Sequence, residues 1–196
     1  MKLVLATHNA HKVAELRDIL GPLLDGIDLI GYDGPEAVED GATFQENALI
    51  KARAAFAHTG LPAIADDSGI CLAVLGGAPG INSARYAGTR VDEDNVAHLL
   101  KELAAVGAHS EADRRAEFCC AAAFVAEGIE HVELGVWRGT VLPAPVGTHG
   151  FGYDPVFRPD GYAVASAELT AQQKNEISHR HRAFTALLPL VREHVL

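Results

Sequence analysis

Short apolar segments alternate with amphipathic segments of helical periodicity from the first residues of this chain, and no other feature restricts its fold as much. Lys2–Ala6 is short, apolar and followed by turn-forming residues, which predicts a buried strand. Over Ala10–Leu20 the apolar side chains recur at helical spacing, and Gly21-Pro22 ends the pattern. Ile27–Gly31 is a second strand candidate. Because a helical crossover allows two strands to pair in parallel, we expect an α/β fold.

The same alternation continues to the C-terminus. Thr43-Phe44-Gln45-Glu46 is a capping-box sequence, and Leu49, Ala52 and Phe56 are expected on the inner face of the helix that it opens. The further elements are expected at these positions: a loop over 32–42, the capped helix to Thr59, short strands over Ala63–Ala65 and Ile70–Leu75, a helix over Asp92–Ala105, strands over Arg115–Glu127 and Glu130–Leu142, a loop over 143–161 and a helical segment from Thr170.

Two local signals refine this outline. Gly128-Ile129 separates the last two strands, and this spacing is typical of a hairpin. The C-terminal helical segment is expected to break near Ile177-Ser178 and to kink or end at Pro189, since proline cannot donate to the carbonyl of Thr185. We interpret residues 1–196 as one α/β domain around a mixed sheet flanked by helices.

Charge and cysteine content exclude several kinds of protein. The 26 acidic and 16 basic side chains give a formal charge of −10, which argues against binding along duplex nucleic acid. Three cysteines without a CxxC spacing fit a reducing compartment. The longest apolar run, Phe118–Ala126, is much too short for a membrane span. The chain is therefore expected to be cytoplasmic and unanchored.

The first cluster of polar residues is Thr7-His8-Asn9-Ala10-His11-Lys12, where the first strand gives way to a helix. Amide groups and the helix dipole make such a junction a natural anion site, and Lys12 adds a positive charge. The alternative is that Thr7 or Asn9 only caps the helix and that Lys12 is solvated. No Gly-Lys pair exists in the chain, so this is not a Walker A loop.

The second cluster, Asp66-Asp67-Ser68-Gly69, follows an apolar strand candidate. Two carboxylates there are costly unless positive groups lie beside them, and such oxygen ligands suit Mg²⁺. The alternative is a turn with a solvated aspartate. Glu39 and Asp40 could supply a further carboxylate, although alone they read as a solvated acidic loop.

Two clusters lie in the C-terminal third. In Gly150-Phe151-Gly152-Tyr153-Asp154, Phe151 could stack on a base and Asp154 could accept hydrogen bonds from its edge; the alternative is a structural turn. Lys174 and Ser178-His179-Arg180-His181-Arg182 gather positive charge near a helix start. The His179-x-His181 spacing does not indicate a metal site, because no further ligand falls at suitable spacing.

Together these clusters resemble one family, the non-canonical purine nucleoside triphosphate pyrophosphatases, also called XTP/dITP diphosphatases or inosine triphosphatases. The matching segments cover nearly the whole chain in order: LATHNAHKVAEL (5–16), EDGATFQENALIKARAA (39–55), PAIADDSGI (62–70), GGAPGINSARYAG (76–88), GFGYDPVF (150–157) and AELTAQQKNEISHR (167–180).

The resemblance implies an elongated α/β fold around a long twisted mixed sheet, a homodimer, Mg²⁺ dependence, and hydrolysis of ITP, dITP and XTP to the monophosphate and pyrophosphate. It implies Asp67 as catalytic base, Asp67, Asp66 and Glu39 as metal ligands, and the following substrate contacts: Thr7, Asn9 and Lys12 with the intervening His8, Ala10 and His11, then Lys51, Ser68, Phe151, Gly152, Tyr153, Asp154, Lys174, His179 and Arg180. The residues from Phe151 to Arg180 in this list are expected at the base.

Two positions depart from the family's pattern. His8 stands where a small residue is common, and its side chain is expected to point outward; Asp40 stands where Thr is common and adds negative charge beside Glu39. Two other functions stay open: a pyrophosphatase for modified pyrimidine nucleotides, as in the Maf-like proteins that share the fold, and a non-catalytic nucleotide-binding module. The FGYD and SHR segments favour the purine substrate, and the presence of Asp67, Glu39 and Lys12 favours catalysis.

Overall fold

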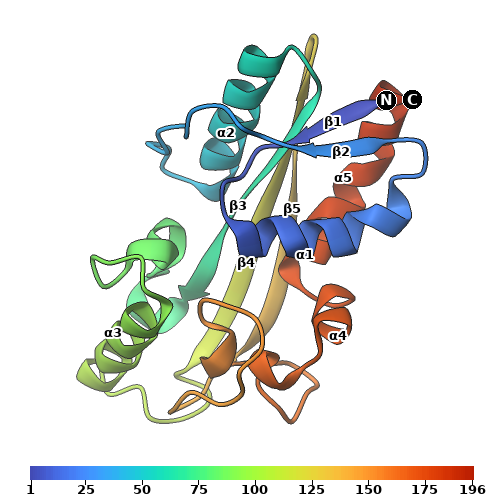
Figure 1. Cartoon of the computed structure of the whole chain (residues 1–196). Coiled ribbons are helices and arrows are strands. Elements are labelled where there is room, and N and C mark those ends of the chain that lie inside the picture. The colour runs from blue at the N-terminus through green and yellow to red at the C-terminus, as the bar shows by residue number, and fades with distance from the viewer. The chain divides into compact units, whose positions relative to one another are not determined.

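Six strands form one mixed sheet in the computed structural model, which describes residues 1–196 (Figure 1). The sheet order is β2-β1-β3-β4-β5-β6. β1 pairs in parallel with β2 and with β3, whereas β6 pairs antiparallel with β5. The strands are β1 (Lys2–Leu5), β2 (Asp28–Gly31), β3 (Ala63–Leu72), β4 (Arg115–Ala126), β5 (Ile129–Val141) and β6 (Phe157–Pro159). The expectation of a mixed α/β sheet is confirmed.

Five α-helices connect and follow these strands: α1 (Ala10–Leu20), α2 (Phe44–Thr59), α3 (Asp92–Ala105), α4 (Ala171–Asn175) and α5 (His179–Val195). Residues divide between two compact units. The first contains Met1–Asp67, Cys120–Gly135 and Ser178–Leu196, and the second contains Ser68–Cys119 and Val136–Ile177. The single-domain interpretation of 1–196 stays a prediction.

The first unit is layered because its strands alternate. Leu3, Leu5 and Ile64 pack on one face against α1 and α5, through apolar residues such as Leu16 and Phe184. On the opposite face, the small side chains of β1, β3 and β4 pack against α2. Figure 1 shows α2 and α5 on opposite sides of these strands. The two apolar faces thus hold α1, α2 and α5 in place against the strand that carries Asp66 and Asp67.

The second unit has its own apolar core. Val96, Leu99 and Leu103 of α3 pack with Ile70 and Leu72 of β3 and with residues of the long hairpin. Three rings close the core: the Phe157 centroid lies 4.7 Å from that of Phe118 and 5.1 Å from that of Trp137. Edge-to-face ring pairs of this kind add about 0.5–1.5 kcal/mol beyond burial alone.

Several expected boundaries are confirmed where a cap fixes them. α1 and α3 cover the predicted ranges, and Thr43 caps α2 by accepting from the Glu46 amide. Gly60 ends α2 with φ +68°, a conformation that glycine adopts without strain. The break before α5 is confirmed as well, since Ser178 is its N-cap. None of the helices combines the length and the apolar character that a membrane span requires.

The expectation of a short strand ending at Asp66, followed by a turn, is wrong. β3 runs without interruption from Ala63 to Leu72, and Ala73–Leu75 is a 3-10 helix. The strand tolerates two adjacent aspartates because each carboxylate is paired with positive side chains. Gly69 also has a packing role, because a Cβ there would overlap the Gly80 carbonyl and the Ser83 hydroxyl.

Three smaller expectations have different outcomes. α5 continues through Pro189 to Val195, so the helix does not end there; the buried side chains on both sides of the proline, Leu188 and Val191, anchor the helix to the core despite the missing N–H. The alternative, a kink at Pro189, stays a prediction. Within the loop expected at 143–161, β6 pairs with β5, and its three residues are too few to show periodicity. The inner face expected for α2 is confirmed: Ala52 is fully buried, and Leu49 and Phe56 are partly buried and pack against the same core.

Candidate functional site

The junction between β1 and α1 presents the backbone amides of a helix start. The Asn9 side chain accepts from the amides of His11 at 3.0 Å and Lys12 at 3.2 Å, and the Thr7 hydroxyl accepts from the Asn9 amide at 3.2 Å. Asn9 therefore caps α1, as the alternative interpretation predicted, and Ala10 is the first helical residue. Capping does not exclude an anion, because the helix dipole still points at this loop.

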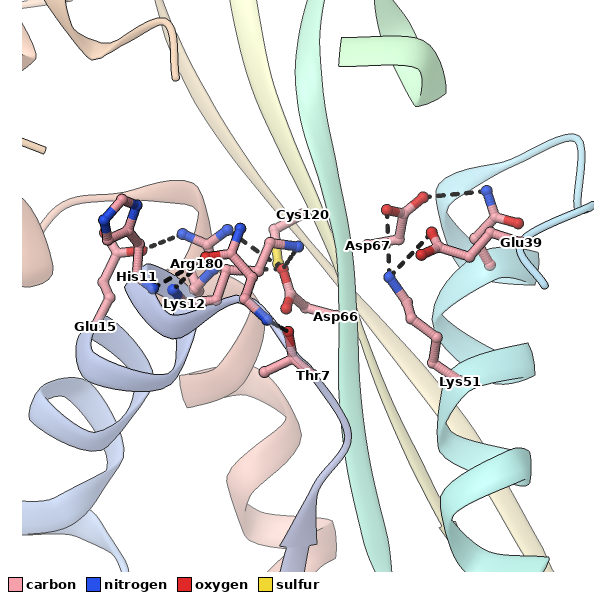
Figure 2. Close-up of polar contacts among 12 residues, drawn as sticks. Thr7, His11, Lys12, Glu15, Glu39, Lys51, Asp66, Asp67, Cys120 and Arg180 are labelled. Carbon is pink, nitrogen blue, oxygen red and sulfur yellow. Dashed lines mark hydrogen bonds and ion pairs between the residues drawn. The ribbon is translucent and has the colours of Figure 1, made fainter. Parts of the chain in front are cut away.

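Lys12 reaches from this helix to the middle of β3. Its Nζ lies 2.9 Å from Asp66 Oδ2, and the same carboxylate oxygen is 3.3 Å from both Nε and Nη2 of Arg180 (Figure 2). Arg180 also donates to Glu15 of α1, so one guanidinium joins two carboxylates. Asp66 and Arg180 are almost wholly buried. We call Lys12, Glu15, Asp66 and Arg180 the buried ion cluster.

Charges in the buried ion cluster are strongly coupled. Burial by itself would raise the pKa of Asp66, but Lys12 and Arg180 hold it well below its usual range. Burial would lower the pKa of Arg180, and Asp66 and Glu15 raise it instead. Asp66 is consequently ionised throughout the neutral range. Such a carboxylate orients its cations and cannot act as a general base near neutral pH.

A second group of charges converges on Lys51 of α2. Lys51 Nζ lies 3.1 Å from Glu39 Oε2 and 3.5 Å from Asp67 Oδ1 (Figure 2). Asn47, one helical turn before Lys51, donates from Nδ2 to Asp67 Oδ2 at 3.2 Å and accepts from the Gly41 amide at 2.9 Å. The loop that carries Glu39 is thereby tied to the helix that carries Lys51. We call Glu39, Asn47, Lys51 and Asp67 the Asp67 cluster.

Asp67 differs electrically from its neighbour. Its pKa is raised, chiefly by burial, with Glu39 and Asp66 adding to the effect against the opposing charges of Lys51 and Lys12. For Lys51, burial lowers the pKa, but Asp67, Asp66 and Glu39 outweigh it and the pKa is raised. A carboxylate whose pKa is raised is a stronger proton acceptor, which suits a general base.

Strand alternation explains why adjacent residues behave so differently. Successive side chains of β3 point to opposite faces, so Asp66 faces α1 and α5 while Asp67 faces α2. Figure 2 shows the two carboxylates on opposite sides of the strand. The two clusters are thus separate although one dipeptide supplies both.

The Asp67 cluster fits a magnesium ion. Glu39 and Asp67 approach one ammonium group from two sides, and both side chains keep some exposure, at 31% and 10%. The residues present do not form a group of three or more acidic, His or Cys ligands. Mg²⁺ does not require one, since it usually takes one or two carboxylates plus waters and substrate phosphates. Asp66 fits less well, because its Oδ2 is committed to Lys12 and Arg180.

The second unit holds a third cluster around Asp154. Its carboxylate accepts from Lys174 Nζ at 2.6 Å, from the Phe151 amide at 2.9 Å and from the Ser166 hydroxyl at 2.9 Å. Lys174 Nζ also lies 4.9 Å from the Phe151 ring centroid. Asp154 and Lys174 are buried. A ring and an ammonium held this way can offer a stacking face and a hydrogen-bond donor to a planar ligand.

The loop before Asp154 is shaped by its glycines. Gly150 has φ +74°, and a Cβ there would overlap the Asp154 carboxylate. Gly152 donates its amide to Asp92 at 2.6 Å, and the Tyr153 hydroxyl donates to the Ser83 carbonyl at 2.8 Å. Burial raises the pKa of Tyr153, so this hydroxyl stays protonated and keeps its donor role.

The remaining predicted residues have these places. His8 is exposed, as expected for an outward-pointing side chain, yet its Nε2 lies 3.0 Å from the Gly34 carbonyl. His11 lies on the exposed part of the first turn of α1. Ser68 follows Asp67 in β3 and belongs to the second unit, while buried His179 starts α5. Contact of any of them with substrate stays a prediction.

Sequence reasoning missed Glu15, Asn47 and Ser166. The first two had a weak signal. Glu15 precedes Leu16 on the inner part of an amphipathic helix, where a charge needs a partner. Asn47 stands one turn before Lys51 on the same helix face. Ser166 gave no signal, because only the folded chain brings it to Asp154.

Carboxylates on a central strand that meet lysines from flanking helices, with a helix N-terminus nearby, are typical of α/β proteins that bind phosphorylated ligands. The particular family follows from sequence and structure comparison. The Ham1 family model matches residues 3–190, and the chain belongs to this family.

Relatives share almost the full length. The dITP/XTP pyrophosphatase of Leifsonia xyli subsp. xyli is 50% identical over 98% of this chain and 96% of its own. That of Streptomyces avermitilis is 52% identical over 98% of both chains. Among solved structures, a HAM1 protein from Coxiella burnetii has a TM-score of 0.87 at 40% identity, with 98% of this chain and 99% of that chain covered.

Proposed function

We propose that this protein hydrolyses dITP, ITP and XTP to the nucleoside monophosphate and pyrophosphate, with Mg²⁺, and so keeps deaminated purines out of DNA and RNA. The observation that carries the proposal is the Asp67 cluster: a basic carboxylate beside Glu39 and Lys51. Full-length similarity to proteins named dITP/XTP pyrophosphatase supports the substrate class.

In the proposed reaction, a water oxygen attacks the α-phosphorus and the bond to the bridging oxygen of pyrophosphate breaks. Asp67 accepts the proton of the attacking water, a role worth about 10²–10⁴-fold. Glu39 and Asp67 would hold Mg²⁺, which when bound neutralises phosphate charge and orients the substrate. Lys51 sits between these carboxylates and supplies a further positive charge.

Lys12 and the amides at the start of α1 bind the polyphosphate in this proposal. Asp66 already holds Lys12 Nζ in a fixed position, and Arg180 and Glu15 hold Asp66. A lysine that is oriented in advance loses less side-chain freedom on binding, which favours affinity. Asp66 is thus proposed to position Lys12 rather than to serve as a main metal ligand.

Base recognition is assigned to the Asp154 cluster. Hypoxanthine and xanthine carry a 6-oxo acceptor where adenine carries an amino donor. A donor such as Lys174 can form a hydrogen bond with the 6-oxo group. The 6-amino group of adenine would stay unpaired at the same position, which costs about 1–3 kcal/mol of binding free energy. Phe151 offers the ring on which a base stacks. Arg180 was expected to share this role, but its guanidinium is engaged by Glu15 and Asp66.

A homodimeric state and a cytoplasmic location are proposed together with the activity. The resemblance to the family supports a homodimer, and the sparse cysteines without a CxxC spacing agree with a cytoplasmic location. Light scattering of the purified protein tests the first, and fractionation of the source cells tests the second. A monomer at micromolar concentration would contradict the dimer.

One assay tests the activity directly. Pyrophosphate release is measured from ITP, dITP, XTP, ATP, GTP and a 5-modified UTP, each with Mg²⁺ and with excess chelator. We expect release from the first three and not from ATP or the modified UTP, and only with Mg²⁺; GTP shares the 6-oxo group, so its rate tests whether the 2-position is recognised as well. A preference for the pyrimidine would favour the Maf-like alternative. Tight binding without release would favour a binding module.

A further inference from the structure

Two of the three cysteines are neighbours on the sheet, although 48 positions apart in sequence. Cys71 lies in β3 and Cys119 in β4, strands that are adjacent in the sheet order. Both belong to the second unit and both are half-buried. Their side chains are hydrogen-bonded to each other. Neither residue has a role in the proposed hydrolysis.

Strand alternation places these two thiols on the open face of the second unit. Residues Ile70, Leu72 and Phe118, next to them in the strands, point into the apolar core. Cys71 and Cys119 therefore point to the other face, together with Glu117, whose carboxylate pairs with exposed Arg138. A small oxidant in solution can reach thiols on this half-buried face.

The third cysteine provides an internal contrast. Cys120 is fully buried on the core face of β4, and its Sγ lies 3.9 Å from Asp66 Oδ2. Burial and Asp66 raise the pKa of Cys120 well above its ordinary value. The hydrogen bond from Cys119 instead lowers the pKa of Cys71, against burial and the charge of Glu117. Thiolate is the reactive form, so Cys71 is the reactive member.

We propose that Cys71 and Cys119 are a reversible oxidation site, which a peroxide converts into an intramolecular disulfide between β3 and β4. The Cys71 thiolate attacks one peroxide oxygen, the O–O bond breaks, and the released hydroxide takes a proton to form water. The Cys119 sulfur then attacks the sulfenic sulfur of Cys71 and displaces its hydroxide, which leaves as water with the Cys119 proton. Overall, two thiols and one peroxide give one disulfide and two waters.

The site is independent of nucleotide hydrolysis, and its test does not use catalytic activity. Native protein is treated with equimolar hydrogen peroxide, and remaining thiols are alkylated after denaturation. Mass spectrometry without reductant is expected to show a loss of two hydrogens, one alkylated thiol at Cys120, and a cross-linked pair of peptides. A dithiol reductant is expected to restore three alkylated thiols.

Three variants make the test specific. Cys120→Ser is the matched control and is expected to form the same cross-link. Cys119→Ser is expected to stop at a sulfenic acid on Cys71, which a dimedone probe captures, and Cys71→Ser is expected to form no internal cross-link. A wild-type protein that only gains oxygen, that links between molecules, or that links through Cys120 would overturn the proposal.

Discussion

Asp66 and Asp67 show how one dipeptide can supply two kinds of carboxylate. The faces of β3 assign Asp66 to a buried site with Lys12 and Arg180, and Asp67 to a partly open site with Lys51 and Glu39. Lys12 and Arg180 lower the pKa of Asp66, so this carboxylate stays ionised. Lys51 and Lys12 offset the effect of burial on Asp67 only in part, so the pKa of Asp67 is raised. Because successive side chains of a strand point to opposite faces, Asp66 can position Lys12 while Asp67 serves proton transfer on the other face.

Replacement of Asp67 by Asn is expected to lower ITP turnover by at least about 10²-fold, because the proton acceptor is lost while the shape is kept. The measurement is kcat for pyrophosphate release, with circular dichroism to confirm folding. Asp18→Asn makes the same chemical change on the exposed side of α1 and is expected to leave turnover unchanged. Near-normal turnover of Asp67→Asn would remove Asp67 from the mechanism.

Glu39→Gln is expected to raise the Mg²⁺ concentration needed for half-maximal activity by about tenfold or more, since one of two charged ligands is lost. Direct Mg²⁺ titration by calorimetry is the second readout. Asp40→Asn removes the adjacent, exposed carboxylate and is the matched control. Equal effects of both substitutions would show that bulk negative charge, not ligation by Glu39, sets the metal requirement.

Arg180→Ala leaves Glu15 and Asp66 buried without their shared cation. Removal of one partner from a buried ion pair typically costs about 3–5 kcal/mol of unfolding free energy. Urea denaturation of the variant measures this loss. Arg17→Ala on the exposed face of α1 is the control, with an expected change within about 0.5 kcal/mol. A stable Arg180→Ala protein that has lost only its ITP preference would instead support the base contact expected from the family.

At the scale of elements, helix starts position the functional groups. Asn9, Thr43 and Ser178 cap α1, α2 and α5, and each cap fixes the first turn that leads to Lys12, to Lys51 or to Arg180. A cap contributes about 1 kcal/mol to stability, but its larger effect here is to set the register at which these side chains leave the helix. The packing of these helices on the sheet then brings the three side chains to Asp66 and Asp67 of β3.

Gly135 of β5 lies against the start of α5, and we expect that no larger residue fits there. A Cβ at Gly135 would overlap the His179 carbonyl and lie 2.6 Å from the Ala183 amide. Gly135→Ala must therefore displace the first turn of α5 and is expected to cost about 1–3 kcal/mol. Gly31→Ala in edge strand β2 meets nothing within 4 Å and is the control. Equal thermal unfolding midpoints for both variants would contradict this close approach.

Local signals predicted some of these elements and not others. α1 and α3 could be delimited from periodicity and from residues at their ends, because those signals depend on neighbours in sequence. β3 was divided in two, since adjacent aspartates are typical of turns. Its continuity depends on Lys12, Lys51 and Arg180, which come from remote segments. β6 has only three residues, and strand β5 alone decides its pairing.

At the scale of the whole molecule, each of the two compact units holds scarce lysines beside carboxylates. The chain carries a net charge of −10. Lys12, Lys51 and Lys174 nevertheless all lie in the three clusters, and each is held by a carboxylate. The motifs singled out these three lysines, and their contact with substrate stays a prediction. The motifs could not predict the partners Glu15, Asn47 and Ser166, because these contacts exist only after folding.

The division of residues between the two compact units leads to the last prediction. Lys12 belongs to the first unit and is proposed to bind phosphates, which all nucleotides share; Lys174 belongs to the second and is proposed to face the base. Lys12→Ala should therefore lower kcat/KM for ITP and ATP by the same factor. Lys174→Gln should lower kcat/KM for ITP more than for ATP. The ratio of kcat/KM for ITP to that for ATP should fall by roughly 5- to 150-fold, the equivalent of about 1–3 kcal/mol.

The ratio of the two kcat/KM values is the decisive quantity. Lys174 pairs with buried Asp154, so its loss can reduce the folded fraction, but a smaller folded fraction lowers both rates equally and leaves the ratio unchanged. A wild-type ratio in Lys174→Gln would place the discriminating donor elsewhere. A ratio that collapses in Lys12→Ala as well would show that phosphate binding and base recognition are coupled, because only then does a lost phosphate contact change the choice between bases.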